Sequence, residues 1–188
     1  MTIDNRHITK REHSVEVLNH LLALLDCSLA RYLSFARPWV RRRYLLLDAI
    51  ARRMSYEHEI FARRIARLIS DRRGMVQSCV FPMGFTSYND LSLEFLALRL
   101  LEHQRALVVT AEESAKQLDE DLEARRVVNK IVASLQRYAE LLQELLSPNR
   151  VAPPPANEAS VDEAPRRPAS SVERKRFEQF AVETHTAA

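Results

Sequence analysis

The chain has 188 residues, of which 46% are hydrophobic, and its formal net charge is +3. This length and apolar content suffice for one globular domain, and with only two glycines the composition favours long helices over hairpin-rich sheets. No run of about 20 residues is free of charge, and the N-terminus lacks the apolar core of a signal peptide, so we expect an all-α cytoplasmic protein without a membrane span.

Two helices are expected in the first part of the chain. Apolar residues at steps of three and four predict a helix over 13–37, which Pro38 interrupts. A second periodic run follows, and Gly74 is expected to supply its C-terminal stop. The short turn between the two runs predicts that the helices are antiparallel.

The connection over residues 73–90 is unusually long for a compact helical protein and contains Pro82 and Gly84. An extended segment of this length can run along a helix, so we expect a crossover that starts the third helix parallel to the second. Its large apolar residues need cover from the same chain or from another one. They are Val80, Phe81, Met83 and Phe85.

The third helix is predicted to begin near Asn89 or Asp90, either of which can cap it, and to end near Leu118. The residues predicted on or near its inner side are Leu91, Phe95, Leu98, Glu102, Leu107 and Val109. A fourth helix follows the acidic DEDLE and ends at the proline-rich SPNRVAPPP. The sequence thus predicts four long helices with one long crossover.

Three segments of the chain differ in composition. Residues 1–12 are predicted to be an N-terminal extension, 13–147 the helical domain, and 148–188 a disordered Pro-rich tail. A short amphipathic helix over 171–182 is possible within the tail, and it would dock on the domain or on a protein partner that the sequence does not identify.

The two cysteines, Cys27 and Cys79, form no CxxC pair and no metal-ligand spacing. We therefore expect buried or idle thiols rather than a disulfide framework.

The stretch LNHLLALLDCSLARYLSFAR, residues 18–37, resembles the first helix of bacterioferritins, which has a similar opening, a metal-binding Glu, a Tyr seven residues later and a following Ala-Arg pair. The resemblance, together with the crossover, implies a ferritin-like up-down-down-up four-helix bundle. Proteins of this superfamily hold two metal ions with a Glu from each of two helices and a Glu-x-x-His pair from each of the other two.

The positions implied by the resemblance do not carry that ligand set. They hold Leu25 on the first helix, His58 and Phe61 on the second, Glu102 on the third, and Ser134 and Arg137 on the fourth. A guanidinium opposes metal cations, and large apolar side chains would fill their space. We therefore expect a degenerate centre without metal, in a protein that is not an enzyme and acts through assembly or partner binding.

The alternative is a divergent iron-binding oxidoreductase or iron-storage protein. If metal binds, His58 and Glu102 are the first candidate ligands, and a one-residue slip of register would bring Asp26 and Glu57 nearer the core. A single inward histidine is more often a hydrogen-bonded core residue, so we expect His58 to be paired to Tyr32, Glu102 or Tyr138.

Arginines are concentrated on the second helix and its approach. Phosphate contacts could follow, as in the ferritin-like proteins that protect DNA, but pairing with acidic residues of neighbouring helices or of a second subunit is favoured. The resemblance also implies a homodimer or larger assembly. We expect Phe81, Met83 and Phe85 to bury apolar surface in it.

Overall fold

The computed structural model describes residues 5–147. The predicted disordered tail, 148–188, and the possible helix at 171–182 lie outside the described residues. Within these bounds the chain is all-α, as predicted, and contains no strand. The helices are α1 (Asn5–Asp26), α2 (Leu29–Ala36), α3 (Leu45–Asp71), α4 (Leu93–Gln117) and α5 (Leu122–Leu146), with short 3-10 helices η1 (Arg42–Tyr44) and η2 (Met83–Tyr88). None of the helices between residues 5 and 147 has the length and apolarity that a membrane span requires.

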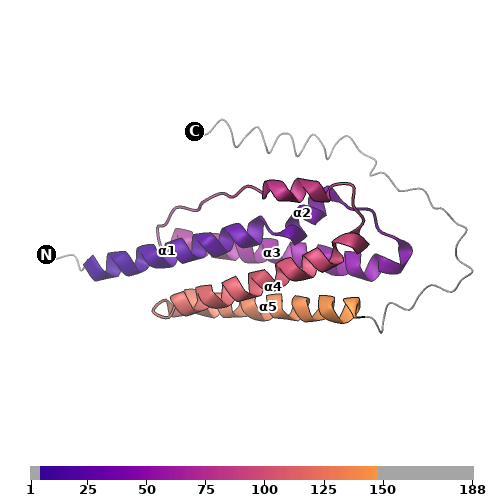
Figure 1. Cartoon of the computed structure of the whole chain (residues 1–188). Helices are drawn as coiled ribbons and strands as arrows, with labels where there is room; N and C mark the ends of the chain where they lie inside the picture. Colours follow the sequence, from indigo (N-terminus) through magenta and orange to yellow (C-terminus); the bar gives the residue numbers. More distant parts are fainter. Residues whose placement is uncertain (1–4, 148–188) are drawn as a thin grey trace, which may run out of the picture. The chain divides into compact units, whose positions relative to one another are not determined.

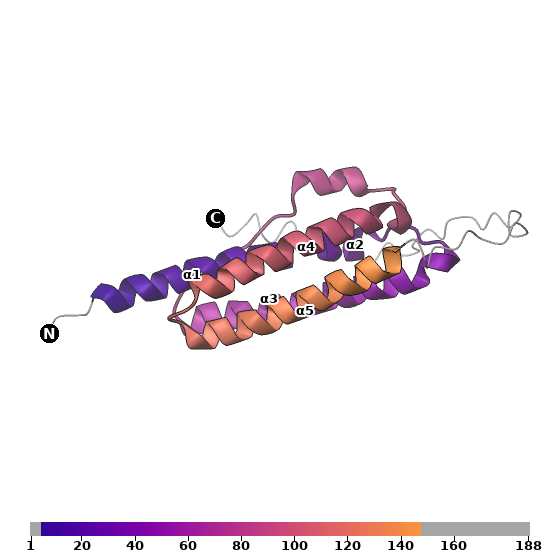
Figure 2. The ribbon, with the colours of Figure 1, turned by 60° about the horizontal axis from the view of Figure 1, so that its bottom comes forward.

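The four long helices lie side by side. The helix α1 packs on α3 and α4, and α5 packs on the same two helices from the other side. Figure 1 and Figure 2 show that α1 and α5 run in one direction and α3 and α4 in the other. The short helix α2 continues from α1 and packs mainly on α3.

The predicted continuous helix over 13–37 is wrong at its centre. The helix begins earlier, at Asn5, and it ends at Asp26, after which α2 begins at Leu29. Ser28 adopts extended backbone between them, and its Oγ accepts a hydrogen bond from the Arg31 N–H at 3.4 Å. A serine in this position satisfies a free amide of the new helix, so it starts α2 as an N-cap. The apolar spacing continues across the break and therefore concealed it.

The end of α3 corrects the expectation that Gly74 stops the helix. Arg73 adopts the left-handed conformation with φ 50, and α3 has already ended at Asp71. Gly74 itself does not have a positive φ. Its role is close approach, because a Cβ at this position would lie 2.7 Å from the γ-carbons of Val15 on α1.

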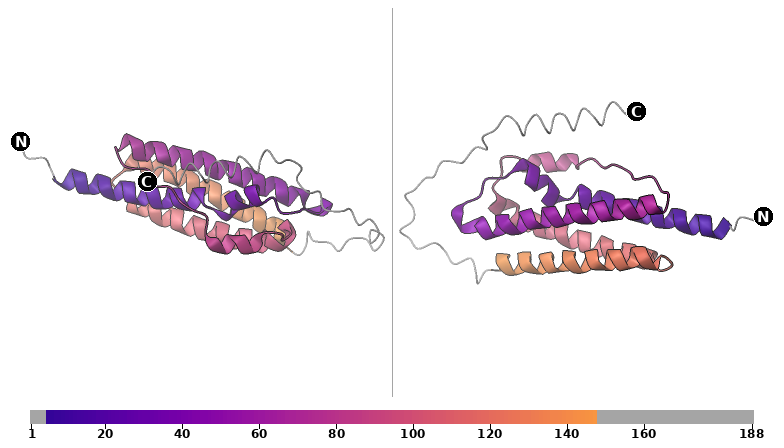
Figure 3. Two further views of the ribbon diagram at one scale, coloured as in Figure 1. Left: turned by 90° about the horizontal axis from the view of Figure 1, so that it is seen from above. Right: turned by 180° about the vertical axis from the view of Figure 1, so that it is seen from behind.

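The connection between α3 and α4 runs back along the molecule from the end of α3 to the start of α4 (Figure 3). The Asn19 side chain holds it at one point, donating to the Met75 carbonyl at 3.0 Å and accepting from the Gln77 N–H at 2.9 Å. At a second point Cys79 forms a disulfide with Cys27, with the Cα atoms 6.4 Å apart. The prediction of two idle thiols is therefore wrong.

The apolar residues of the connection divide into two pairs. Phe85 is buried and Phe81 is half-buried, and both rings contact Tyr32 with centroids 5.4 and 5.5 Å apart, respectively. Val80 and Met83 are exposed. Two of the three residues expected in a dimer interface thus pack on their own chain.

The core has two parts that meet near the break between α1 and α2. The buried members of the first, here called the aliphatic end, are all aliphatic and include Leu18, Leu21, Leu25, Ile65, Ile69, Leu118, Val128, Ile131 and Leu135. The second, the aromatic end, contains Leu29, Leu47, Met54, Phe85, Leu96, Leu100, Tyr138 and Leu142, with Tyr32, Tyr44, Phe81 and Tyr88 packed against them.

Candidate functional site

Two of the residues at implied ligand positions are ordinary core residues. Leu25 is fully buried in the aliphatic end, and Phe61 packs against the same cluster. Their side chains fill space between α1 and α3, since both helices contribute residues to this cluster. Metal and its water would have no volume there.

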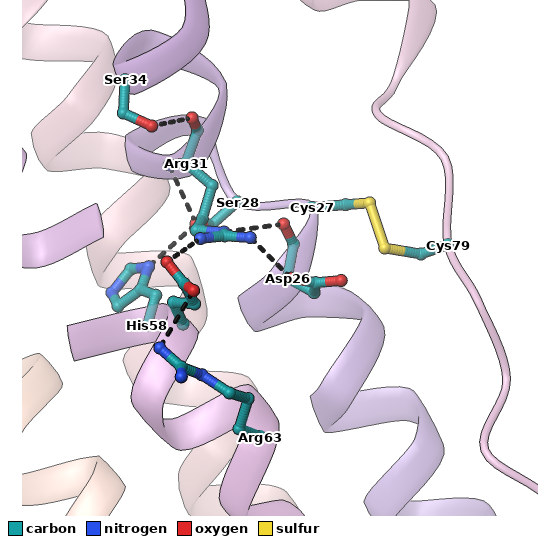
Figure 4. A network of polar contacts seen from close by, with 9 residues as sticks. Asp26, Cys27, Ser28, Arg31, Ser34, His58, Arg63 and Cys79 are labelled. Atoms are coloured by element: carbon teal, nitrogen blue, oxygen red, sulfur yellow. Dashed lines mark hydrogen bonds and ion pairs between the residues drawn. A yellow bond between two sulfur atoms is a disulfide. The ribbon is translucent and has the colours of Figure 1, made fainter. Parts of the chain in front are cut away.

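Asp26 lies at the last turn of α1 and points to Arg31 on α2 (Figure 4). The Arg31 guanidinium donates to Asp26 Oδ1 at 3.1 Å and to Glu59 Oε2 at 2.8 Å. Glu59 in turn accepts from Arg63 at 3.0 Å. Asp26 is therefore part of a chain of ion pairs across the helix break, and its side chain is 46% exposed.

Glu57 lies on α3, and its side chain faces α5. It accepts hydrogen bonds from Ser134 Oγ at 2.7 Å and Tyr138 OH at 2.8 Å, and Arg53 and Arg137 donate to it at 3.1 and 3.2 Å. The structure thus brings Glu57 to Ser134 and Arg137, the two positions on the last helix that the resemblance singled out. The contact uses these side chains to join two helices.

The electrostatics of this cluster keep Glu57 ionised. Burial alone would raise the pKa of its carboxyl, but the hydrogen bonds from Ser134, Tyr138 and Arg53 and the positive charge of Arg137 outweigh it and lower the pKa. Burial first, and then the hydrogen bond to Glu57 and its negative charge, raise the pKa of Tyr138, although Arg53 and Arg137 oppose them. A carboxylate with four donors has few free lone pairs for a metal.

His58, the next residue on α3, points the other way into the core and is 1% exposed. Its Nδ1 lies 2.8 Å from Ser28 Oγ, at the break between α1 and α2, and its Nε2 has no hydrogen-bond partner. Burial lowers the pKa of His58 to about 3, with further lowering by His103 and Arg31. The histidine is thus a hydrogen-bonded core residue, as expected, and it is neutral. Its partner is Ser28 rather than Tyr32, Glu102 or Tyr138.

The predicted inner side of α4 is wrong, because the structure buries a different polar residue from the one predicted. Glu102 lies on the outer surface, 61% exposed, and pairs with Arg99 at 2.9 Å. Gln104 points inward instead, is 1% exposed and donates to the Leu135 carbonyl at 3.0 Å. Phe95, Leu98 and Val109, also predicted on or near the inner side, are exposed, whereas Leu107 from the same set is buried.

The four predicted metal ligands therefore do not converge. Asp26 faces Arg31, Glu57 faces α5, His58 faces Ser28 and Glu102 faces Arg99. Among residues 5–147, no three His, Cys, Asp or Glu side chains are grouped closely enough to hold a metal ion.

A shallow groove of about 470 Å³ lies over the Glu57 cluster. Its walls are Ala49, Ile50, Arg53, Glu57, Arg137, Tyr138 and Leu141, from α3 and α5. The guanidiniums of Arg53 and Arg137 are already bound to the carboxylate, and each also lies over a tyrosine ring, with centroid distances of 5.6 Å to Tyr56 and 5.0 Å to Tyr138. The groove is lined with groups that satisfy one another, which is typical of a structural contact.

Ser28 is one of the buried polar residues that the sequence interpretation missed. The signal was present, because a serine followed by a new helical run is a capping pattern. Gln104 was missed because the inner side was assigned to Glu102. A residue two positions later on a helix points to a different side, so Gln104 was not placed inside.

Comparison of the chain with protein-family models, with curated proteins and with solved structures finds no match. The interpretation of the site therefore depends on its own geometry.

Proposed function

We propose that the chain is a divergent ferritin-like up-down-down-up four-helix bundle. The support is the direction of the four long helices and the long connection that lets α4 start parallel to α3. The broken first helix, with Ser28 at the break, is a departure from the pattern that the resemblance implies.

The proposed function is that of a scaffold with a degenerate centre, which acts through assembly or partner binding and not through metal chemistry. One observation carries it: the four candidate ligands Asp26, Glu57, His58 and Glu102 turn to four separate neighbours. The three carboxylates each accept from arginine, so a metal ion would first have to displace a cation that is already paired. The polar residues buried in the interior of the bundle include His58, Ser28 and Gln104, none of which supplies a negative charge.

Elemental analysis of protein purified after iron supplementation tests this proposal. We expect far less than one iron per chain and no oxidation of Fe(II) by O₂ above buffer. Two irons per chain, lost in the Glu57→Ala and His58→Ala variants but kept in the surface control Glu113→Ala, would overturn the proposal and favour the iron-binding alternative.

The arginine-rich surface supports a scaffold more than a nucleic-acid site. Many of its guanidiniums are engaged within the chain, including Arg52 with Asp48, Arg63 with Glu59, and Arg72 with Asp121. Binding to DNA would require these pairs to exchange partners. Salt-sensitive DNA binding that is lost on replacing Arg63, Arg64 and Arg67 by Ala would contradict this preference.

Residence in the cytoplasm stays a prediction from the sequence, and the Cys27–Cys79 pairing provides its test. Disulfides are typical of oxidising compartments and rare in the cytosol. Trapping of free thiols at the moment of cell lysis decides the matter. Two alkylated cysteines per chain fit a reducing compartment, and none fits an oxidising one.

A further inference from the structure

The outer side of α4 carries large apolar residues that no part of residues 5–147 covers. Phe95 is 68% exposed, Leu98 63% and Val109 53%. With the exposed residues Glu102 and Ala106 they recur at steps of three and four, so the five side chains form one line along the helix, here called the α4 stripe. The opposite side of α4 is buried through Leu93, Leu96, Ala97, Leu100, Gln104, Leu107 and Ala111.

The α4 stripe has an internal symmetry that suits pairing with itself. Measured from Glu102, Phe95 and Val109 stand at equal distances before and after it, and so do Leu98 and Ala106. If a second α4 lies antiparallel on the first with Glu102 at the centre, each larger side chain faces a smaller one. Phe95 then meets Val109 of the other copy, and Leu98 meets Ala106. A twofold contact of this kind uses the same patch on both subunits.

The charges beside the stripe follow the same symmetry. Arg99 and Arg105 stand at equal distances on either side of Glu102, and Arg99 already pairs with this carboxylate at 2.9 Å. Arg105 donates to Gln143 on α5 at 3.0 Å, so its guanidinium lies on the side of α4 that faces α5. In the antiparallel pair, Arg99 of one copy stands opposite Arg105 of the other, and the two central carboxylates lie between these guanidiniums. The repulsion between the carboxylates is offset, and the contact keeps an excess of positive charge, because four guanidiniums face two carboxylates.

We infer that the α4 stripe is a self-association surface, in which two copies of this chain pack their α4 helices antiparallel about a twofold axis at Glu102. The inference rests on the proposed function, because it names the partner in the assembly. It replaces the crossover as the contact, since Phe81 and Phe85 are packed against Tyr32 of their own chain.

Sedimentation of the full chain with matched variants tests the surface. Leu98→Glu places a charge in the stripe, and Leu122→Glu places one at the start of α5, where the leucine has nearly the same exposure, 61%. We expect a wild-type dimer at micromolar concentration, a dissociation constant at least about tenfold weaker for Leu98→Glu, and no change for Leu122→Glu. Unchanged circular dichroism shows that the variants are folded.

Cysteine cross-linking tests the direction and the axis. Glu102→Cys is expected to form a disulfide-linked dimer under mild oxidation, whereas Lys130→Cys, on the exposed side of α5, is expected to stay uncrosslinked. An equimolar mixture of Phe95→Cys and Val109→Cys should cross-link, and neither variant should do so by itself. Cross-linking of Phe95→Cys with itself would indicate a parallel pair and overturn the antiparallel arrangement.

A monomeric wild-type chain at tens of micromolar would overturn the inference. So would a dimer that is insensitive to Leu98→Glu but dissociated by Met83→Glu, because the crossover would then be the contact. Neither result bears on iron content, which is measured separately. The inference about the surface and the proposed absence of metal chemistry therefore fail independently.

Discussion

The aliphatic end and the aromatic end of the core are built by different means. In the aliphatic end, long stretches of α1, α3, α4 and α5 interdigitate branched side chains, and the buried members contain no aromatic ring. In the aromatic end, α2, the connection before α4 and the start of α4 meet around Phe85, which contacts Tyr32, Tyr88 and His103. The aliphatic end follows from the periodic apolar residues of the long helices. The aromatic end depends on where the connection between α3 and α4 is held.

The regular helices pack in the aliphatic end, and the irregular segments are fastened at the junction with the aromatic end. Three contacts meet at the junction, where Ser28 caps α2, His58 contacts Ser28 and Cys27 binds Cys79. Of the metal positions implied by the resemblance, His58 contacts this junction through Ser28. The junction thus holds the broken helix and the connection before α4 in place.

The largest expected effect on the free energy of unfolding comes from a core substitution in the aliphatic end. Leu25→Ala leaves a cavity beneath α1 in a site with no exposure, and we expect it to lower the free energy of unfolding by about 2–5 kcal/mol. Leu122→Ala, a leucine that is 61% exposed, should change it by less than about 0.5 kcal/mol. Urea denaturation measures both, and equal effects would show that the described packing at Leu25 is wrong.

Removing the disulfide should weaken the aromatic end. The bridge joins residues 52 positions apart, and a disulfide that closes a loop of this size typically raises the free energy of unfolding by about 2–4 kcal/mol. The Cys27→Ser/Cys79→Ser double variant should therefore unfold at lower urea, and amide hydrogens of residues 76–92 should exchange faster while those of α5 are little changed. Uniform acceleration over the whole chain would instead show that the two ends are not separable.

Neutralising Glu57 tests the contact between α3 and α5 beside the junction. Glu57→Gln keeps the shape but removes the charge that four donors share, so we expect a loss of about 1–3 kcal/mol. Glu59→Gln is the matched control, because its carboxylate also pairs with two arginines but is 41% exposed, and it should lose less than about 1 kcal/mol. Thermal unfolding compares the two variants, and a larger effect at Glu59 would contradict the burial of Glu57.

The smallest expected effect is a pH dependence from His58. Its pKa is about 3 in the folded chain, mainly because it is buried, with His103 and Arg31 lowering it further and Glu57 opposing them. In the unfolded chain the pKa is about 6.5, so the unfolded state binds the proton first and stability falls as pH drops below that value. We expect the wild type to lose about 1 kcal/mol more than His58→Gln between pH 6.5 and 5.5.

Urea denaturation across this range, with His103→Gln as a second comparison, checks that prediction. Burial also lowers the pKa of His103, so its variant should remove a smaller part of the slope. Parallel pH profiles for the wild type and His58→Gln would mean that His58 is not buried in its neutral form.

The sequence by itself determined the all-α class, the four long helices and the long connection. Leu18, Leu25, Ile65, Ile131 and Leu135 lie at helical spacing within the predicted helices, and the structure buries them. These features depend on local period and on breakers such as Pro38, which act within a few residues of the chain. The same reasoning predicted that His58 is a hydrogen-bonded core residue.

Only the tertiary structure decided the contents of the candidate site. The disulfide joins Cys27 and Cys79 across 52 positions, and no local pattern encodes that proximity. The side of α4 that faces inward is set by packing on α5 and α1, which placed Gln104 inside and Glu102 outside. On a helix with apolar residues on two sides, periodicity does not tell the core from a face that is left for another chain, because both follow the same spacing.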